Sequence, residues 1–162
     1  MIDRTTLAMA GIVICAGLYM SGGIDTGLTE KWQQLSFTPE IPEAQHVYYA
    51  PCIAIDGDTL RCDSRRVRLL GIDAAELPGH CHPNRQCAPG DPHAQADALR
   101  IYANTGPLAI TVLEQDRYGR DVAIVESERD GIAQCYMIRQ GASYVAKWDK
   151  RGYIGRKCGV TG

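Results

Sequence analysis

Six cysteines between residues 52 and 158 limit the folds open to this chain more than its composition does. The sequence has seven cysteines in 162 residues, and the remaining one, Cys15, lies in an uncharged N-terminal stretch. An even number of cysteines outside such a stretch is typical of disulfides formed in an oxidising compartment. The alternative is a set of reduced, buried thiols in a cytoplasmic protein.

One disulfide follows from the expected strand pairing. Asp56-Gly57 separates two apolar, β-branched runs, which predicts a tight hairpin turn centred near Gly57. Cys52 and Cys62 are then directly opposite each other on neighbouring strands, where their side chains share a face and can be bridged. We therefore predict a Cys52–Cys62 disulfide inside the hairpin.

The other four cysteines are assigned by position. Cys81 and Cys87 enclose a short Pro-rich loop and are expected to close it, which leaves Cys135 to pair with Cys158. Three histidines lie in or near the same loop: His80, His82 and His93. A zinc site is the alternative there, but the C-x-x-C and H-x-x-x-H spacings are absent from this part of the sequence, so a disulfide is favoured.

Residues 7–24 carry no charge and are long enough to cross the apolar core of a membrane. They indicate a retained signal anchor or a cleaved signal peptide, and the weakly basic start favours the anchor. We divide the chain into this segment (1–24), a polar spacer (25–45) and one globular domain (46–162). The domain is expected to be membrane-anchored and to face the periplasm or exterior, or to be secreted if the N-terminus is cleaved.

The globular part has the pattern of a small, mainly β (α+β) domain. Helical spacing with Pro or Gly at the ends predicts helices at 93–103 and 131–139, and a last helical turn in the tail. Residues 77–92 are rich in Pro, Gly, Cys and His and predict a loop. This order predicts an OB-type barrel with helices packed on it. Strands are expected at 47–55, 59–62, 67–72, 108–113 and 122–125, with a short extended segment at 142–147.

The net charge of the chain is −2, which excludes a polycationic nucleic-acid binder. Such proteins hold phosphates through many Lys and Arg side chains. A phosphodiesterase that takes its cation from solution needs only a few local arginines, so the charge leaves that class open.

Three polar clusters carry the candidate chemistry: residues 55–59 (IDGDT), 67–76 (VRLLGIDAAE) and 116–120 (DRYGR). Each alone is explained equally well as a turn or a charged strand edge. Together they supply two aspartates after strand ends, Asp58 and Asp73, which suit a hard divalent cation. Glu76 is placed to contact a water molecule. Phosphodiester hydrolysis needs such groups together with phosphate-binding arginines, because charge grows on the phosphate as water attacks.

These motifs occur in the order seen in the thermonuclease, or staphylococcal nuclease-like, family, which residues 53–148 resemble. The resemblance implies a five-stranded OB barrel with three helices and a calcium-dependent nuclease. Such enzymes cut DNA and RNA with little sequence preference and leave 3′-phosphate ends. By motif position, the implied calcium ligands are Asp58, Asp73 and the main-chain carbonyl of Ala74.

The resemblance also implies roles for side chains around the substrate. Arg68 and Arg120 would bind the scissile phosphate through their planar guanidinium groups. Glu76 would act as the general base or orient the attacking water. Arg117 and Tyr118 match positions that lie near the bound nucleotide in the family.

The chain departs from the family pattern in two places. The family often has Thr-Pro between the aspartate and the glutamate, where this chain has Ala74-Ala75. Ala74 still provides a main-chain carbonyl oxygen as a ligand, but without the proline the position of Glu76 is expected to be less restricted. After the last helix the sequence has Trp148, which either stacks on a base or closes the core.

Two other functions fit the same sequence. One is a non-catalytic accessory or scaffold subunit, docked on a membrane-protein partner by its N-terminal helix. The other is a zinc-stabilised OB module that binds nucleic acid without cutting it. A scaffold has no need of the complete acidic and arginine set, so a nuclease acting on DNA or RNA is the favoured hypothesis.

Overall fold

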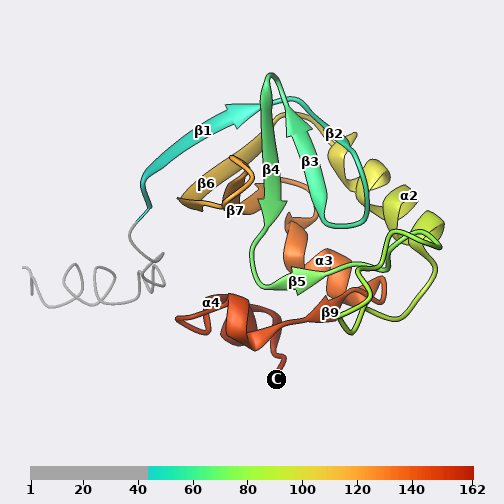
Figure 1. Cartoon of the computed structure of the whole chain (residues 1–162). Helices are drawn as coiled ribbons and strands as arrows, with labels where there is room; N and C mark the ends of the chain where they lie inside the picture. Colours follow the sequence, from blue (N-terminus) through green and yellow to red (C-terminus); the bar gives the residue numbers. More distant parts are fainter. Residues whose placement is uncertain (1–43) are drawn as a thin grey trace, which may run out of the picture. The chain divides into compact units, whose positions relative to one another are not determined.

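The computed structural model describes residues 44–162, and within them the chain is mainly β with three helices (Figure 1). The helices are α2 (Pro92–Ala103), α3 (Ala133–Arg139) and α4 (Tyr153–Cys158), with a 3₁₀ turn at Ala146–Trp148. The strands are β1 (His46–Ala50), β2 (Cys52–Ala54), β3 (Thr59–Cys62), β4 (Arg65–Leu69), β5 (Ile72–Asp73), β6 (Leu108–Gln115), β7 (Asp121–Ser127), β8 (Gly131–Ile132) and β9 (Ser143–Tyr144).

One chain segment forms both edges of the large sheet. The strand order is β1-β6-β7-β4-β3-β2, with β8 paired to β7, and only Pro51 separates β1 from β2. Because proline has no N–H to donate, the ladder breaks at Pro51, and β1 pairs with β6 while β2 pairs with β3. The sheet is curled (Figure 1), and the single strand predicted at 47–55 is two strands.

Helix α2 packs against β2 and α3. Asp91 caps its first turn by accepting a hydrogen bond from the backbone N–H of His93 at 2.9 Å. Leu99 and Tyr102 are fully buried, and the Tyr102 hydroxyl donates to the Gly131 carbonyl at 2.6 Å. Burial raises the pKa of Tyr102 to about 12, so this phenol stays protonated and remains a donor.

Two sequence predictions after α2 are corrected. Residues 131–132, expected to be helical, form β8, and α3 begins only at Ala133. In the segment expected to be extended at 142–147, only Ser143–Tyr144 is a strand, and it pairs with β5. Both differences arise because short segments with mixed spacing follow their tertiary neighbours more than their local pattern.

All three predicted disulfides are present: Cys52–Cys62, Cys81–Cys87 and Cys135–Cys158. Within the β2–β3 hairpin, Cys52 is directly opposite Cys62, as the hairpin register predicts. The third bridge joins α3 to α4, the last helix. Each bridge narrows the unfolded ensemble by closing a loop of the chain.

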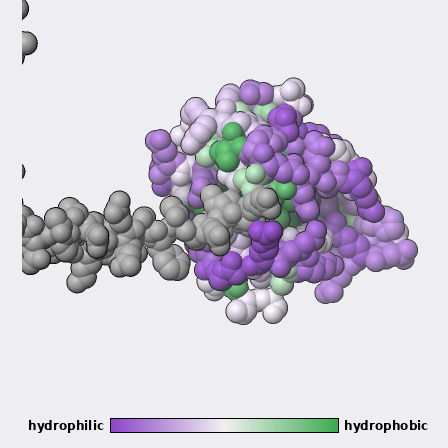
Figure 2. Space-filling view, turned by 90° about the vertical axis from the view of Figure 1, so that its left-hand side faces the viewer, coloured by the Kyte–Doolittle hydropathy of each residue, from purple (hydrophilic) through white to green (hydrophobic). Residues whose placement is uncertain are grey.

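The predicted signal anchor or signal peptide (1–24) and most of the spacer (25–45) lie outside the described residues. In the part that the structure describes, no helix has the length and apolar character needed to cross a membrane. The face of the domain in Figure 2 is largely hydrophilic, and its hydrophobic areas are small and separate.

Candidate active site

The loop between β2 and β3 carries Asp58 into the interior. Residues 55–58 join the two strands, one residue more than the predicted strand bounds leave between them, and the turn is centred at Gly57 as predicted. The N–H of Asp58 donates to Asp56 Oδ1 at 3.0 Å, a local bond that aspartate favours in turns. Asp58 is only 3% exposed. The loop therefore buries an acidic side chain that needs partners.

Asp73 reaches the same region from β5. Gly71 separates β4 from β5 with φ +70, a conformation that glycine adopts without strain. Strand β5 pairs with β9, which sets Asp73 opposite Ser143. Asp73 is 4% exposed, so a second carboxylate is buried at the end of this short strand.

Arg68 joins the two aspartates. Its Nη1 donates to Asp58 Oδ1 at 2.7 Å and its Nη2 to Asp73 Oδ1 at 3.1 Å. The backbone N–H of Ala74 donates to Asp58 Oδ2 at 3.0 Å, which brings the Ala74 main chain into the same cluster. The side chains of all three charged residues are at most 15% exposed. Two of the residues predicted as metal ligands, Asp58 and Asp73, therefore meet around one guanidinium, and the third, Ala74, joins them through its N–H bond to Asp58.

Burial raises the pKa of Asp58 to about 6, and the neighbouring Arg68 acts in the opposite direction. The charged form of this carboxylate is thus costly even beside one arginine, and an added cation would reduce that cost. No three His, Cys, Asp or Glu side chains within residues 44–162 gather closely enough to form a metal site by themselves. A hard cation bound here would combine the two aspartates with carbonyl or water oxygens, a donor set that calcium accepts.

Glu76 is connected to this cluster through Arg85, which the sequence reasoning missed. Arg85 Nη2 donates to Asp73 Oδ1, and its Nη1 lies 3.6 Å from Glu76 Oε1. The Glu76 side chain is 34% exposed, so it is open to solvent while the two aspartates are not. Arg85 lies in the loop closed by Cys81–Cys87, and no motif or spacing in the sequence marks it.

The pairing of β4 with β7 brings Arg120 toward Arg68. Strands β4 and β7 are parallel, with Arg68 paired to Val122. Arg120 directly precedes β7, two residues before Val122, and it lines the same pocket as Arg68. Arg120 Nε donates to Asp116 Oδ2 at 2.7 Å, and its backbone N–H bonds the same carboxylate at 3.0 Å. Asp116 therefore holds Arg120 just before β7.

Arg68, Arg85 and Arg120 line a pocket of about 480 Å³, and among the residues that line it the positively charged side chains outnumber the negatively charged ones. Trp148 forms part of its wall, with the guanidinium carbons of Arg68 and Arg85 at 5.5 and 5.6 Å from its ring centre. Tyr118 is 65% exposed at the rim and also lies beside two guanidinium groups. The charged residues that line the pocket are Arg68, Arg85, Glu114, Asp116, Arg117, Arg120, Lys147 and Lys150.

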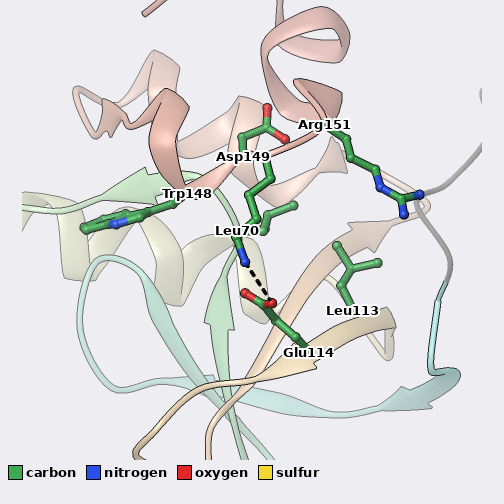
Figure 3. Close-up of a pocket in the computed structure, with 7 residues that line it drawn as sticks. Leu70, Leu113, Glu114, Trp148, Asp149 and Arg151 are labelled. Carbon is green, nitrogen blue, oxygen red and sulfur yellow. Dashed lines mark hydrogen bonds and ion pairs between the residues drawn. The ribbon is translucent and has the colours of Figure 1, made fainter.

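A smaller pocket of about 220 Å³ shares Trp148 and Glu114 with the first (Figure 3). Leu70 and Leu113 form its apolar side, and Lys150 Nζ lies 3.4 Å from Glu114 Oε2, the contact dashed in Figure 3. Glu114 and Lys150 line both pockets, so the two pockets are neighbours at this ion pair.

The alternative zinc site is not formed. Cys81 and Cys87 are joined to each other, so neither can act as a thiolate ligand. Within the described residues, the nearby histidines belong to no group that could hold a metal ion.

Gly57 fixes the approach of the Asp58 loop to β5. A Cβ on Gly57 would lie 2.6 Å from the Ala74 Cβ and 3.0 Å from the Gln95 Cβ. We expect Gly57→Ala to lower the free energy of unfolding by about 1–3 kcal/mol, because the loop and the segment around Ala74, directly after β5, must move apart. The shift in the urea unfolding midpoint measures this effect.

The matched control is the double variant Gly57→Ala/Ala74→Gly, which removes the closer methyl group. It should regain most of the lost stability, because the 2.6 Å clash is gone while the Ala74 main chain is kept. Equal destabilisation of the single and double variants would contradict the steric explanation.

The structure thus joins Asp58, Arg68, Asp73 and Ala74 through direct contacts, and Arg85 connects Glu76 to them. Arg117, Tyr118 and Arg120 line the same pocket as Arg68. Comparison with known proteins adds no identity: no protein-family model matches the chain, and no curated protein matches it.

Proposed function

We propose that the protein is a calcium-dependent phosphodiesterase that hydrolyses DNA or RNA with low sequence specificity and leaves 3′-phosphate ends. The observation that carries this proposal is that two buried aspartates and a partly exposed glutamate pair with Arg68 and Arg85, two arginines that also line a cation-rich pocket. A purely structural ion-pair network has no need of an open, cation-rich pocket beside it.

We infer that the curled sheet is an OB-type barrel, in which β1 and β2 act as one bent strand beside β3, β4, β7 and β6. The strand order and the parallel pairing of β4 with β7 support this inference. Barrels of this type often bind nucleic acid on an exposed sheet face and its flanking loops.

In the proposed reaction, Arg68 and Arg120 bind the oxygens of the scissile phosphate. Arg68 has five N–H donors, and three hydrogen bonds within the protein leave two for a phosphate. A calcium ion held by Asp58, Asp73 and the Ala74 carbonyl would supply positive charge to the phosphate. Glu76 orients a water molecule and takes its proton, and its partial exposure allows water to reach it.

Calcium dependence tests the proposal on the full-length chain. We expect the protein to cleave single-stranded DNA in the presence of calcium, and a chelator to abolish cleavage, which added calcium restores. The rate of oligonucleotide cleavage measures this effect, and mass spectrometry of the fragments identifies 3′-phosphate ends.

Cleavage that continues unchanged in excess chelator would contradict the role of the cation. A chain that cuts neither DNA nor RNA, but co-purifies stoichiometrically with membrane subunits, would instead support the accessory-subunit alternative. The three disulfides support a location in the periplasm or outside the cell, where such bonds persist.

A further inference from the structure

Arg85 occupies an unusual place in the pocket, because it belongs to a loop without regular secondary structure. Residues 77–91 form no strand or helix. The Cys81–Cys87 disulfide closes the middle of this loop, and both sulfur atoms contact the Arg85 carbonyl oxygen, at 3.7 and 3.9 Å. The bridge is therefore packed directly against the backbone of the residue that reaches the site.

Glu76 has little else in the structure to fix its orientation. Strand β5 ends at Asp73, and two backbone hydrogen bonds follow before Glu76: the Ala74 N–H donates to Asp58 Oδ2 at 3.0 Å and the Ala75 N–H to the buried Gln95 Oε1 at 2.7 Å. The side chain of Glu76 itself forms an ion pair with Arg85. A partly exposed glutamate samples several rotamers, and an ion pair to a guanidinium that also bonds Asp73 restricts them.

We propose that Arg85 is a positioning residue that holds Glu76 beside Asp73, and that the Cys81–Cys87 disulfide keeps Arg85 in place. The proposal rests on the phosphodiesterase function proposed above. In this proposal the loop disulfide contributes to the reaction as well as to folding. It positions the Arg85 guanidinium beside Glu76, the residue proposed to orient the attacking water.

The disulfide matters because it limits where Arg85 can go. Without it, residues 77–91 become a longer open loop, and the entropy lost when Arg85 contacts Asp73 and Glu76 increases. With the disulfide formed, most of this conformational entropy is already lost when the protein folds. Arg85 also lies 5.6 Å from the Trp148 ring centre, a cation–π contact that holds the guanidinium on the pocket side of the loop.

The kinetic test compares Arg85→Gln with the full-length wild-type chain. We expect kcat to fall about 10- to 100-fold while KM for a single-stranded oligonucleotide changes little, because Glu76 is misplaced but the phosphate-binding arginines remain. Arg85→Lys, which keeps the charge, should recover part of the loss. Arg129→Gln, which alters an exposed ion pair with Asp130, is the control and should match the wild type.

The disulfide is tested by Cys81→Ser/Cys87→Ser. This variant should lose the same factor in kcat, and adding Arg85→Gln to it should cause no further loss. Cys135→Ser/Cys158→Ser removes a bridge elsewhere, so Arg85→Gln should keep its full effect in that background. Additive losses in the Cys81→Ser/Cys87→Ser background, or wild-type kcat for Arg85→Gln, would overturn the proposal.

Trypsin digestion tests the anchoring of Arg85 by the disulfide without relying on the proposed phosphodiesterase activity. Trypsin cuts after arginine, so the rate of cutting after Arg85 reports how firmly its side chain is held. We expect Cys81→Ser/Cys87→Ser to raise that rate at least about tenfold relative to cutting after Arg129 in the same chain, as local opening becomes easier. An unchanged rate would overturn the anchoring of Arg85. An increased rate in a chain that cuts no nucleic acid would support the anchoring and reject the phosphodiesterase.

Discussion

Alanine at Arg68 is expected to lower kcat/KM for single-stranded DNA about 10³-fold or more. Arg68 lines the candidate pocket and has two N–H donors left for a phosphate after its bonds to Asp58, Asp73 and the Ile72 carbonyl. Removing a guanidinium that stabilises charge on a phosphoryl group costs a factor of this size in other enzymes. Steady-state kinetics on a labelled oligonucleotide measures the change.

Folding must be measured beside activity, because the same substitution leaves Asp58 and Asp73 buried without their shared cation. Loss of one partner of a buried ion pair destabilises a protein by about 3 kcal/mol or more. Arg68→Lys separates the two effects: it keeps a positive charge but not the planar fork, so it should be more stable than Arg68→Ala and still strongly impaired.

Arg66 provides the matched control for Arg68. It lies two residues away on β4, is exposed, and is paired with Arg61 in the ladder. It is not among the residues that line the candidate pocket. Arg66→Ala should therefore leave kcat/KM within about twofold of the wild type, as expected for a surface change away from the site. If both arginine variants lost activity equally, a general effect of charge would explain the result better than a specific phosphate contact.

The hairpin shows what the sequence can specify. A turn centred at Gly57 requires Cys52 to be opposite Cys62, and the structure has that register and that disulfide. The prediction of a single strand at 47–55 was wrong, because an apolar, β-branched run does not reveal that Pro51 divides it between two partners. Local pattern identifies a strand, whereas tertiary pairing decides where it is interrupted.

The candidate site divides in the same way. Asp58, Arg68 and Asp73 stand next to strand ends and turns that the pattern identifies, so their proximity was predictable. The position of Arg85 was not predictable, because it depends on how an irregular loop that carries a disulfide lies against β5. Trp148 was left with two interpretations, and the structure puts it in the pocket wall beside two guanidinium groups. Such contacts come from loops and short turns, which carry little periodicity.

Glutamine at Glu76 should lower kcat about 10²- to 10⁴-fold with little change in KM or stability. The substitution keeps the size of the side chain and removes the carboxylate that would accept a proton from water, a contribution that general-base catalysis commonly provides. Because the Glu76 side chain is 34% exposed and its ion pair with Arg85 spans 3.6 Å, the folded state depends little on its charge. Kinetics and thermal unfolding of the full-length variant measure both expectations.

Glu114→Gln is the control for Glu76→Gln, because Glu114 is a second acidic residue near Arg68 and Arg85, lining the pocket that they line, and it pairs with Lys150 at 3.4 Å on the surface. It should keep kcat within about twofold of the wild type, since exposed ion pairs contribute little. If Glu76→Gln kept the wild-type kcat, Glu76 would not be the residue that orients the attacking water and accepts its proton. Equal losses in the two glutamine variants would show that the pocket needs its acidic charge as a whole. The proposed mechanism requires the loss to be specific to Glu76, the carboxylate that Arg85 links to Asp73.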